Sequence, residues 1–583
     1  MPEILRVNLT TGVCAREELP SHYAGLGGRG LTSAIVAREV DPLANPIGPR
    51  NKLVFAPGLL GGTACASSGR LSVGAKSPLT LGVKESNSGG QPGGHLARLG
   101  LLAVIIEGAG EAGKWTQLEI SKSGAKLTPS LAVGLNNYAA VALLRKTFGP
   151  KVSFISIGRA GELRLAAASL AMTDMDGQPS RHAARGGLGA VMGSKWLKTI
   201  VIQPDDREKI PLAKPKVFQK AAKDFTQALM AHPVCGQGLA EFGSAAMMSL
   251  FNEMGVLPTR NFASGSFANS ESLSGETLNQ LTKSRGGEGR VAKGCMTGCV
   301  MRCAGVFPDQ DGERVGKWPD FETMWAFGPN AEISDLDQVA LYDRLCDDLG
   351  VDTIDVGGAL AILMEAGVLK FGDAKGALAA VAKIAEGDPL GRIIGSGAAI
   401  CGKVYGAFRV AEVKGQALPA FDPRSVKGQG VTFATNPQGA DHTAGLSYAS
   451  NILGLGKTVD PLAVGGQAEM SRQTQVLAAA VDALGLCAFV SFAFFENPKA
   501  VAAVVAMLNA RYDWELTVKD LDLLGQKVLA LETDFNRRAG LSAASDRLPE
   551  FFQDEAVGPD KTTFDVSPEE LDKVLKFGDL ETP

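Results

Sequence analysis

The spacing of apolar residues changes once along this chain, near residue 205, and that change limits the folds that the chain can adopt. Before this point, apolar and polar residues alternate in short runs, which is typical of strands. After Pro211, apolar residues recur at intervals of three and four, which is typical of helices. Strands in one part and helices in the other indicate an α+β fold. We therefore expect an N-terminal β-rich platform followed by two mainly α-helical domains.

Seven short runs in the first part predict strands, and one helical pattern interrupts them. The predicted strands cover residues 4–9, 52–56, 70–74, 101–108, 115–120, 152–157 and 197–202, and the predicted helix covers residues 138–148. Glycine is unusually frequent, with 71 of 583 residues against a usual level of about 7%. The glycine-rich segments are expected to connect the predicted elements, and they cover residues 25–30, 58–69, 86–94 and 185–189. No tandem repeat is visible.

The second part contains at least four segments with helical spacing. These segments cover residues 339–349, 378–385, 501–508 and 523–531. Gly350 and Gly387 are predicted to end the first two helices, because glycine is the usual residue at a helix C-terminus. A turn-rich passage at 418–424 suggests a boundary inside this part. We predict three domains, covering residues 1–206, 207–415 and 416–583.

Charge and composition exclude several classes of protein. The net charge is −4, without the basic excess of a nucleic-acid-binding protein. No run reaches the roughly 18 to 20 apolar residues of a membrane span. Residues 1–7 include an acid and alternate, unlike a secretory signal. We therefore expect a cytoplasmic protein, in which nine cysteines are too few for a disulfide scaffold and indicate metal or redox chemistry.

Three of the cysteines form a C-x3-C-x3-C run at Cys295, Cys299 and Cys303. Iron–sulfur clusters and zinc sites both use such thiolates, usually four per site, and buried thiols without a function are the third alternative. A continuous helix would separate the outer two cysteines by about 12 Å, so the segment is predicted to curl, which Gly294 and Gly298 permit. The candidates for a fourth ligand are Cys14, Cys65, Cys235, Cys346, Cys401 and Cys487.

A second pattern is the pair of Asp-x-x-Gly segments that begin at Asp347 and Asp482, each after a helical stretch. For either copy alone, an ordinary helix end with glycine at the C-cap explains the pattern. The pair suggests a function, because two equivalent carboxylates can accept N–H donors from two similar ligands. A carboxylate matches the two-donor edge of a pterin ring, as it matches a guanidinium group.

The chain resembles the aldehyde ferredoxin oxidoreductases over nearly its whole length. The similarity rests on the order of several segments, which are residues 5–12, 28–31, 69–70, 76–80, 87–90, 185–195, the two Asp-x-x-Gly segments and residues 418–424. The resemblance implies a tungsten enzyme with two pyranopterins and one [4Fe-4S] cluster, and a platform that binds the pterins. The family supplies no protein ligand to the metal, so tungsten and molybdenum are not distinguished.

The resemblance also assigns residues to the cofactors. The expected ligands of the [4Fe-4S] cluster are Cys295, Cys299, Cys303 and Cys487. Asp347 and Asp482 would each bind one pterin, and Leu486 is grouped with the cofactor-binding residues. Arg70 would lie between the cluster and a pterin, where a fixed cation binds anionic phosphate.

Three more residues are expected near a Mg²⁺ ion that bridges the two pterin phosphates, namely Asn87, Arg181 and His182. Glycine-rich loops suit such ligands, because backbone N–H groups approach phosphates and a flat ring closely where a Cβ atom would clash. About half of these glycines are expected to serve only tight turns.

Two residues match the active-site residues of the family. Glu322 would act as general base on water or on the hydrated aldehyde, because a carboxylate in an apolar setting can have a raised pKa. His442 would donate a hydrogen bond to the substrate oxygen or to an oxo group on the metal. The alternatives are a solvated glutamate and a structural histidine.

The implied reaction oxidises a small aldehyde to a carboxylic acid and passes electrons to ferredoxin or to an electron-transfer subunit. One alternative is a reductive catalytic subunit of the same superfamily, which acts on an aromatic thioester or carboxylate inside a multi-subunit complex. Another is a non-catalytic zinc-binding protein. A homodimer is left open.

The chain departs from the family in three places. The family usually has C-x2-C-x3-C, whereas the first gap here holds three residues. Thr443 and Ala444 follow His442 where some members place a basic residue, so the favoured aldehyde can differ. No Glu-x-x-His pair occurs near 330–345, so we do not expect a metal ion that bridges a dimer.

Overall fold

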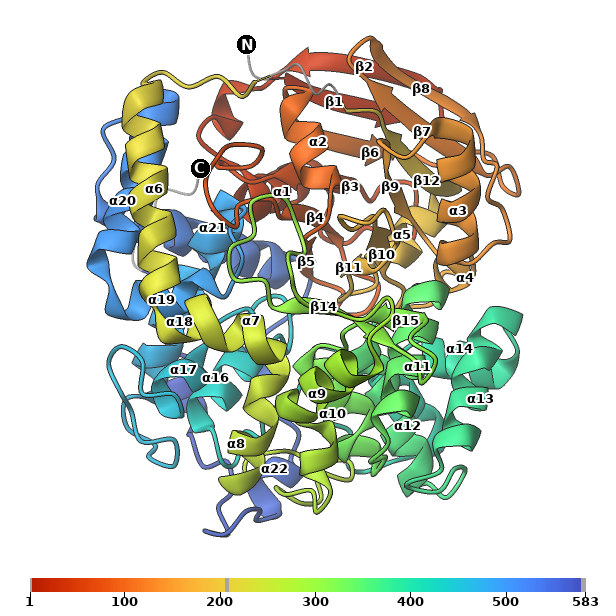
Figure 1. The fold of residues 1–583 in the computed structure, drawn as a ribbon, viewed down its shortest axis with the longest axis vertical. Coiled ribbons are helices and arrows are strands. Elements are labelled where there is room, and N and C mark those ends of the chain that lie inside the picture. Colours follow the sequence, from red (N-terminus) through yellow and green to blue (C-terminus); the bar gives the residue numbers. More distant parts are fainter. Residues whose placement is uncertain (1–2, 205–208, 578–583) are drawn as a thin grey trace.

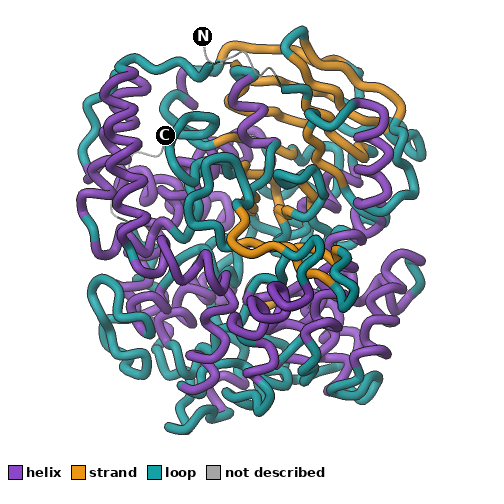
Figure 2. The backbone as a smooth tube through the Cα atoms, viewed as in Figure 1, coloured by secondary structure: helices purple, strands orange, loops and turns teal. Residues whose placement is uncertain are grey.

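The computed structural model describes residues 3–204 and 209–577. Strands gather in the N-terminal third of the chain, and helices dominate the remainder (Figures 1 and 2). This arrangement confirms the α+β fold and the order of its parts, because the change in apolar spacing coincides with the end of the last long strand, Leu197–Ile202.

Two six-stranded sheets form the N-terminal platform. The first has the strand order β2-β1-β6-β3-β4-β5, and the second has the order β11-β10-β9-β12-β7-β8. The strands of the first sheet are β1 (Glu3–Asn8), β2 (Val13–Glu18), β3 (Leu53–Pro57), β4 (Leu71–Lys76), β5 (Val83–Ser88) and β6 (Leu101–Glu107). The strands of the second sheet are β7 (Thr116–Ser121), β8 (Gly124–Pro129), β9 (Ser153–Ser156), β10 (Leu170–Met172), β11 (Arg181–Ala183) and β12 (Leu197–Ile202).

The two sheets are topological copies of each other. Strand β1 pairs antiparallel with β2 and parallel with β6, and β7 pairs in the same way with β8 and β12. Strands β3, β4 and β5 then repeat as β9, β10 and β11, all antiparallel. The fold therefore contains a repeat that is not visible as a tandem repeat in the sequence. The repeat conserves the course of the backbone and not a sequence pattern that can be read from one chain.

All seven strands predicted from alternation are present, as is the helix α3 (Asn137–Phe148). The prediction that glycine-rich segments are only connections is wrong in three places. Helices α1 (Gly28–Glu39), α2 (Pro92–Arg98) and α5 (Leu188–Ser194) begin inside them. Their glycines let these helices pack closely on neighbouring backbone. In α5, a Cβ on Gly189 would come within 2.3 Å of the Ser169 carbonyl oxygen, and in α1 a Cβ on Gly28 would come within 2.2 Å of the Asp482 carbonyl oxygen.

The helical part confirms the four predicted helices as α11 (Leu336–Leu349), α13 (Ala374–Glu386), α20 (Pro498–Tyr512) and α21 (Val518–Arg538). The others of eight residues or more are α6 (Pro215–Ala231), α9 (Gly275–Arg285), α12 (Thr353–Glu365), α15 (Ala398–Tyr405), α16 (Lys427–Thr435) and α18 (Gln467–Leu484). Shorter helices are α4 (Arg159–Glu162), α7 (Leu239–Phe242), α8 (Met247–Glu253), α10 (Phe321–Phe327), α14 (Pro389–Gly395), α17 (Ser447–Asn451), α19 (Val490–Glu496), α22 (Phe551–Asp554) and α23 (Pro568–Leu571).

Two small sheets lie within the helical part and were not predicted. One contains β13 (Arg290–Lys293), β14 (Ala304–Pro308) and β15 (Arg314–Lys317), and the other pairs β16 (Glu412–Val413) with β17 (Gln416–Ala417). The predicted domain boundary at 415/416 falls inside the β16–β17 hairpin, and the boundary at 206/207 lies outside the described residues. The division into three domains stays a prediction.

Two segments that follow strands of the platform pack directly against the C-terminal ends of α18 and α11. The backbone N–H groups of Leu59 and Leu60 donate to the carbonyl oxygens of Ala483 and Leu484, both at 3.1 Å. A Cβ atom on Gly58 would lie 2.0 Å from the backbone nitrogen of Gly485.

The same arrangement recurs in the second sheet, where a Cβ atom on Gly158 would lie 2.1 Å from the Leu349 carbonyl oxygen. The backbone N–H of Ser169 donates to the Gly350 carbonyl oxygen at 2.8 Å. Backbone contact at two equivalent places therefore fixes the helical part on the platform.

Among the described residues, no single helix is long and apolar enough to cross a membrane. The pair α19 and α20, which is bent by 117° at its junction, passes that test by length and composition only.

We predict that Gly58→Ala destabilises the protein by about 1 to 3 kcal/mol, because an added methyl group would meet backbone atoms that have no room to move. Gly94→Ala is the matched control, since no atom lies within 4 Å of its Cβ position inside α2, and alanine there should stabilise by about 0.5 to 1 kcal/mol. Urea unfolding of both variants measures the difference. Equal stability of the two variants would contradict the tight contact.

Candidate cofactor site and active site

The two Asp-x-x-Gly segments occupy equivalent positions in the structure. Helices α11 and α18 both end in a left-handed glycine, Gly350 with φ 73° and Gly485 with φ 74°. Asp347 and Asp482 each lie three residues before that glycine, within the last turn of the helix. The C-cap explanation is therefore confirmed for both segments, and the symmetry also places their carboxylates at equivalent places on the two sheets.

Asp347 lies beside the edge strand β11 of the second sheet. The Nε2 atom of His182 is 3.3 Å from its Oδ1, and the Nζ of Lys317 is 3.3 Å from its Oδ2. Burial lowers the pKa of His182, which favours the neutral imidazole. Burial opposes the charge of Lys317, but Asp343 and Asp347 outweigh it and raise the pKa of this lysine. Asp347 thus remains beside a cation in a buried setting.

Asp482 lies beside the corresponding edge strand β5 of the first sheet. The Nδ2 of Asn87 donates to its Oδ1 at 3.0 Å, and Nη1 of Arg29 donates to its Oδ2 at 3.3 Å. Arg29 is also held by two hydrogen bonds to Glu532, at 2.9 and 2.8 Å. Burial raises the pKa of Asp482 although the charges of Arg29 and Arg70 oppose that rise. Strands β5 and β11 contact each other, so the two carboxylates flank one junction of the sheets.

The cysteine segment curls as predicted and contains no helix between β13 and β14. Its turn includes Gly298, whose φ is 73°. Ser67 joins this turn to the fourth cysteine, because its N–H donates to the Gly298 carbonyl oxygen at 3.0 Å and its own carbonyl accepts from the Cys487 N–H at 2.9 Å. Three cysteines from residues 295–303 and one from residue 487 are therefore held by the same short segment of the platform.

A cavity of about 200 Å³ separates the cysteines from the first aspartate. Its walls include three thiols, four basic side chains and three carboxylates, contributed by Cys295, Cys303, Cys487, Arg70, Arg181, His182, Lys317, Asp320, Asp343 and Asp347. Cys299 does not line this cavity, but its thiol interacts with that of Cys295. Burial raises the pKa of the Cys487 thiol to about 11. The remaining five cysteines do not line this cavity.

The cavity wall offers a free donor and open space near the thiols. The buried Nε of Arg181 has no hydrogen-bond partner among the described residues, so the wall offers a free donor. Gly89 leaves space at the thiols, since a Cβ there would lie 3.2 Å from the Cys295 Sγ. Within residues 3–204 and 209–577, no three His, Cys, Asp or Glu side chains are arranged to hold one metal ion. A four-iron cluster holds its thiolates farther apart than a zinc ion does.

Arg70 lies between the thiols and the second aspartate. Its Nε and Nη2 donate to the side chain and backbone carbonyl of Asn87, the latter at 2.9 Å. Its charge opposes the raised pKa values of Cys295, Cys487 and Asp482. This is the intermediate position that the resemblance implies for it.

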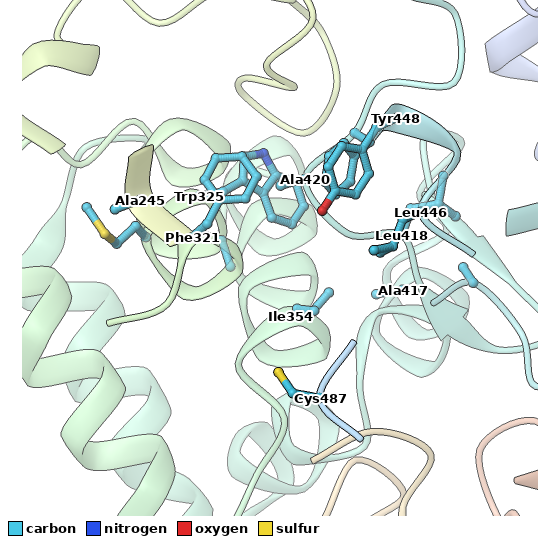
Figure 3. Close-up of a cluster of buried hydrophobic side chains, with 14 of the residues drawn as sticks. Ala245, Phe321, Trp325, Ile354, Ala417, Leu418, Ala420, Leu446, Tyr448 and Cys487 are labelled. Atoms are coloured by element: carbon cyan, nitrogen blue, oxygen red, sulfur yellow. The ribbon is translucent and has the colours of Figure 1, made fainter. Parts of the chain in front are cut away.

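Glu322 lies in the first turn of α10 and only 8% of its surface is exposed. The Ala420 N–H donates to its Oε2 at 2.9 Å, and burial raises its pKa. Its chain neighbour Phe321 belongs, with Tyr448, to a cluster of buried aromatic and aliphatic side chains (Figure 3). Tyr448 stacks on Phe421 with ring centroids 4.6 Å apart. The alternative of a solvated glutamate is therefore wrong, because the side chain is buried and bonded.

His442 lies in the loop between α16 and α17, and its side chain is 26% exposed. Its Nδ1 has no hydrogen-bond partner among the described residues. The charge of His442 acts on Glu322 by lowering its pKa, which places the two side chains in the same neighbourhood. The structure thus brings together two residues that are 120 positions apart in the chain.

Several buried charged residues of this region were not singled out from the sequence. They are Arg29, Lys84, Arg185, Lys317 and Glu532. A single charged residue in a short strand or glycine-rich segment carries no pattern, because its partner lies far away in the sequence. Leu486, which the resemblance groups with the cofactor-binding residues, is fully buried and packs in the core.

Symmetric sheets, paired aspartates and a cysteine-lined cavity define a cofactor-dependent oxidoreductase. The chain matches the family "Aldehyde ferredoxin oxidoreductase, N-terminal domain" over residues 4–204 and "Aldehyde ferredoxin oxidoreductase, domains 2 & 3" over residues 220–577. It belongs to the aldehyde ferredoxin oxidoreductase family, whose tungsten-containing members are its relatives.

Two relatives show the extent of the similarity. The tungsten-containing aldehyde ferredoxin oxidoreductase of Thermococcus kodakarensis is 33% identical, over 96% of this chain and 92% of the relative. The enzyme of the same description from Pyrococcus furiosus gives the same identity and coverage. Among solved structures, the active site complex BamBC of benzoyl coenzyme A reductase matches with a TM-score of 0.79 and 19% identity, over 98% of this chain and 93% of the other. That likeness supports the fold.

We predict that Arg29→Met lowers the free energy of unfolding by about 3 to 5 kcal/mol, because it leaves Glu532 and Asp482 as buried carboxylates without their cation. The control is Arg50→Met, whose side chain is 74% exposed and 3.8 Å from Asp41; it should cost about 0 to 1 kcal/mol. Denaturant unfolding separates the two. A small loss for Arg29→Met would show that Glu532 is satisfied by its other partners.

Proposed function

We propose that this protein oxidises an aldehyde to a carboxylic acid and delivers the electrons to ferredoxin or to an electron-transfer subunit. The balanced reaction takes one aldehyde and one water to one carboxylic acid, two protons and two electrons. The observation that carries the proposal is that Glu322, whose pKa His442 lowers, lies in the chain between Asp320 and Thr323, which line a cavity with three cysteines and several charged side chains.

The residues present fit the cofactors of the family. A tungsten or molybdenum bis-pyranopterin would supply the two-electron oxidation, and a [4Fe-4S] cluster would carry the electrons singly. Cys295, Cys299, Cys303 and Cys487 would hold the cluster. The two pterins would be bound by Asp347 and Asp482.

The cations and polar groups at the junction of the sheets would hold the anionic part of the cofactor. Arg70 and Arg181 offer guanidinium donors, which suit phosphate groups. Asn87 and His182 lie beside the two aspartates, where a Mg²⁺ ion between the phosphates would complete the site.

Glu322 would act as the general base. Its buried carboxylate is oriented by the Ala420 N–H, and the raised pKa makes it a better proton acceptor than an exposed glutamate. It would remove a proton from water or from the hydrated aldehyde. His442 would donate a hydrogen bond to the substrate oxygen, which its place near Glu322 and the partial exposure of its side chain support.

The aromatic side chains around Glu322 would exclude water and receive the apolar part of the aldehyde. Phe321, Phe421 and Tyr448 form this wall with Phe251. Thr443 follows His442 and bonds to Asp441 through its N–H at 3.1 Å and its hydroxyl at 2.9 Å. It therefore brings no charge to the substrate, in keeping with a neutral aldehyde.

Elemental analysis of anaerobically purified protein, followed by an aldehyde panel with a viologen dye, tests the proposal. Tungsten or molybdenum, about four iron atoms per chain and dye reduction are the expected results. Colourless protein with one zinc ion would overturn it in favour of the zinc-binding alternative. Reduction of an aromatic thioester or carboxylate by a multi-subunit complex, without aldehyde oxidation, would favour the reductive alternative.

We predict that Cys487→Ser lowers the iron content from about four atoms per chain to near zero while the protein stays folded. Cys235→Ser is the control, because the Cys235 thiol is buried against the Phe489 carbonyl at 3.4 Å and does not line the cavity. Iron analysis and circular dichroism check both. Unchanged iron in Cys487→Ser would assign the fourth ligand to another residue.

We predict that Glu322→Gln lowers kcat by about 10² to 10⁴-fold, as loss of a general base does. In the native enzyme, kcat/KM should fall as the pH decreases through the raised pKa of Glu322, because the protonated carboxyl cannot accept a proton. We call this fall of kcat/KM at low pH the acid limb, and the variant should lose it. Glu412→Gln is the control, since burial also raises the Glu412 pKa, and its carboxylate accepts a backbone N–H at 2.5 Å away from the site. An unchanged acid limb in Glu322→Gln would assign the base elsewhere.

A further inference from the structure

Arg185 is a buried guanidinium that joins three segments of the chain. It follows the strand β11 on the platform, and only 5% of its surface is exposed. Its Nε donates to Asp352 Oδ2 at 3.1 Å, and its Nη2 donates to the Ala417 carbonyl oxygen at 2.6 Å. Its Nη1 donates to the carbonyl oxygen of Ala440. Each of its nitrogen atoms is therefore engaged by a different segment.

The two carbonyl groups belong to the segments that support the proposed catalytic residues. Ala440 precedes His442 by two residues. Ala417 precedes Ala420 by three residues, and the Ala420 N–H orients the carboxylate of Glu322. One rigid planar group thus links the loop that carries His442 to the loop that holds Glu322. Gln416, next to Ala417, joins the same two loops by donating to the Ala440 carbonyl oxygen.

Asp352 fixes the third side of Arg185. This aspartate caps α12 by accepting the Ile354 N–H at 3.1 Å, and it follows the first Asp-x-x-Gly segment by two residues. Its backbone N–H donates to the Ala167 carbonyl oxygen at 3.0 Å on the platform. Arg185 is therefore anchored to the segment that carries Asp347 while it holds the two loops.

A second buried cation holds the same loop from another side. The Nζ of Lys84, on β5, donates to Asp441 Oδ2 at 2.9 Å, and Lys84 is fully buried. Gly186, next to Arg185, leaves room for this side chain, since a Cβ there would lie 2.4 Å from the Lys84 Cγ. The residue before His442 is thus fixed to the platform independently of Arg185.

We propose that Arg185 is a positioning residue that holds His442 and Glu322 at their working separation through the main-chain oxygens of Ala440 and Ala417. This inference rests on the proposed function for the roles of His442 and Glu322. We call the three hydrogen bonds of Arg185, to Asp352, Ala417 and Ala440, the clamp. The partners in each of these bonds are more than 160 residues apart in sequence.

Arg185 also acts on Glu322 by charge. The titratable groups that face Glu322 are His442 and Arg185, which lower its pKa, and Asp441, which raises it. Tyr448 faces it as well, since the Glu322 charge raises the pKa of that phenol. Loss of the Arg185 charge should therefore raise the pKa of Glu322 further. A purely structural role would not cause this change.

Two variants separate position from charge. Arg185→Lys keeps a charge but has all its donors on one nitrogen, so it cannot span the three separated acceptors that the guanidinium group reaches. Its kcat should fall by about 10²-fold, as small misplacements do, with the acid limb unmoved. Arg185→Met should lower kcat at least as much and move the acid limb of kcat/KM to higher pH. KM should change less than kcat in both, because neither variant removes a group that touches the substrate.

Hydrogen exchange with mass spectrometry gives a readout that does not depend on activity. In Arg185→Met, amides of residues 417–420 and 438–443 should exchange faster together, whereas Arg185→Lys should show a smaller effect. Arg285→Met is the control, because Arg285 also joins a carboxylate and a carbonyl, Asp337 at 2.6 Å and Pro308 at 2.9 Å, on α9. It should leave both segments and the acid limb unchanged.

The outcomes distinguish this inference from the proposed function. If the native enzyme oxidises no aldehyde but Arg185→Met still loosens both segments together, the proposed function fails and the clamp stands. If aldehydes are oxidised but Arg185→Met leaves exchange and the acid limb like those of Arg285→Met, the clamp is overturned. Should Arg185→Met not fold, the kcat and exchange of Arg185→Lys decide in the same way, with wild-type values overturning the proposal.

Discussion

The site depends on backbone contact between two helix ends and two sheets. Gly58 and Gly158 leave no space for a side chain where α18 and α11 meet the platform, so main-chain atoms touch directly. That contact places Asp482 and Asp347 at the junction of the edge strands β5 and β11. It also places Cys487, two residues after Gly485, beside Ser67, which holds the turn of the cysteine segment. One type of close packing therefore positions both aspartates and Cys487. A methyl group on Gly58 would disturb the end of α18 with Asp482 and Cys487, and one on Gly158 would disturb the end of α11 with Asp347.

Buried charges fix the relative positions of the remaining groups. A buried ion pair loses much of its Coulomb energy to desolvation, so its contribution to net stability is often small, although removal of one partner is costly. These pairs instead fix the positions of the joined segments relative to one another. Arg29 joins Asp482 to Glu532, and Glu532 accepts a hydrogen bond at 3.0 Å from Gln438 in the loop that leads to His442. Asp482 is thus connected to the loop that carries His442 by a continuous series of hydrogen bonds across three separate segments.

The sequence predicts the elements whose periodicity is strong and the residues that belong to motifs. Alternation located seven strands, and helical spacing located α11, α13, α20 and α21. Strand β5 was not predicted, because Lys84, Glu85 and Asn87 make it polar; each of these residues faces a charged group that arrives from the helical part. Burial there raises the pKa of Glu85 to about 8, which no local pattern indicates. The cysteines and aspartates were visible from their spacing. Arg29 and Arg185 were not, because their roles follow from partners hundreds of residues away.

The way in which Arg185 binds has a consequence for how substrates can change within this fold. It contacts main-chain oxygens of Ala417 and Ala440, and a carbonyl oxygen is the same whatever side chain its residue bears. The side chains that surround Glu322, such as Phe421 and Tyr448, lie on the same or neighbouring segments but take no part in the clamp. They can therefore be exchanged for larger, smaller or polar residues without moving His442 relative to Glu322. A constant pair of proposed catalytic groups with a replaceable wall would allow the substrate to change while the proposed cofactor site on the platform stays the same.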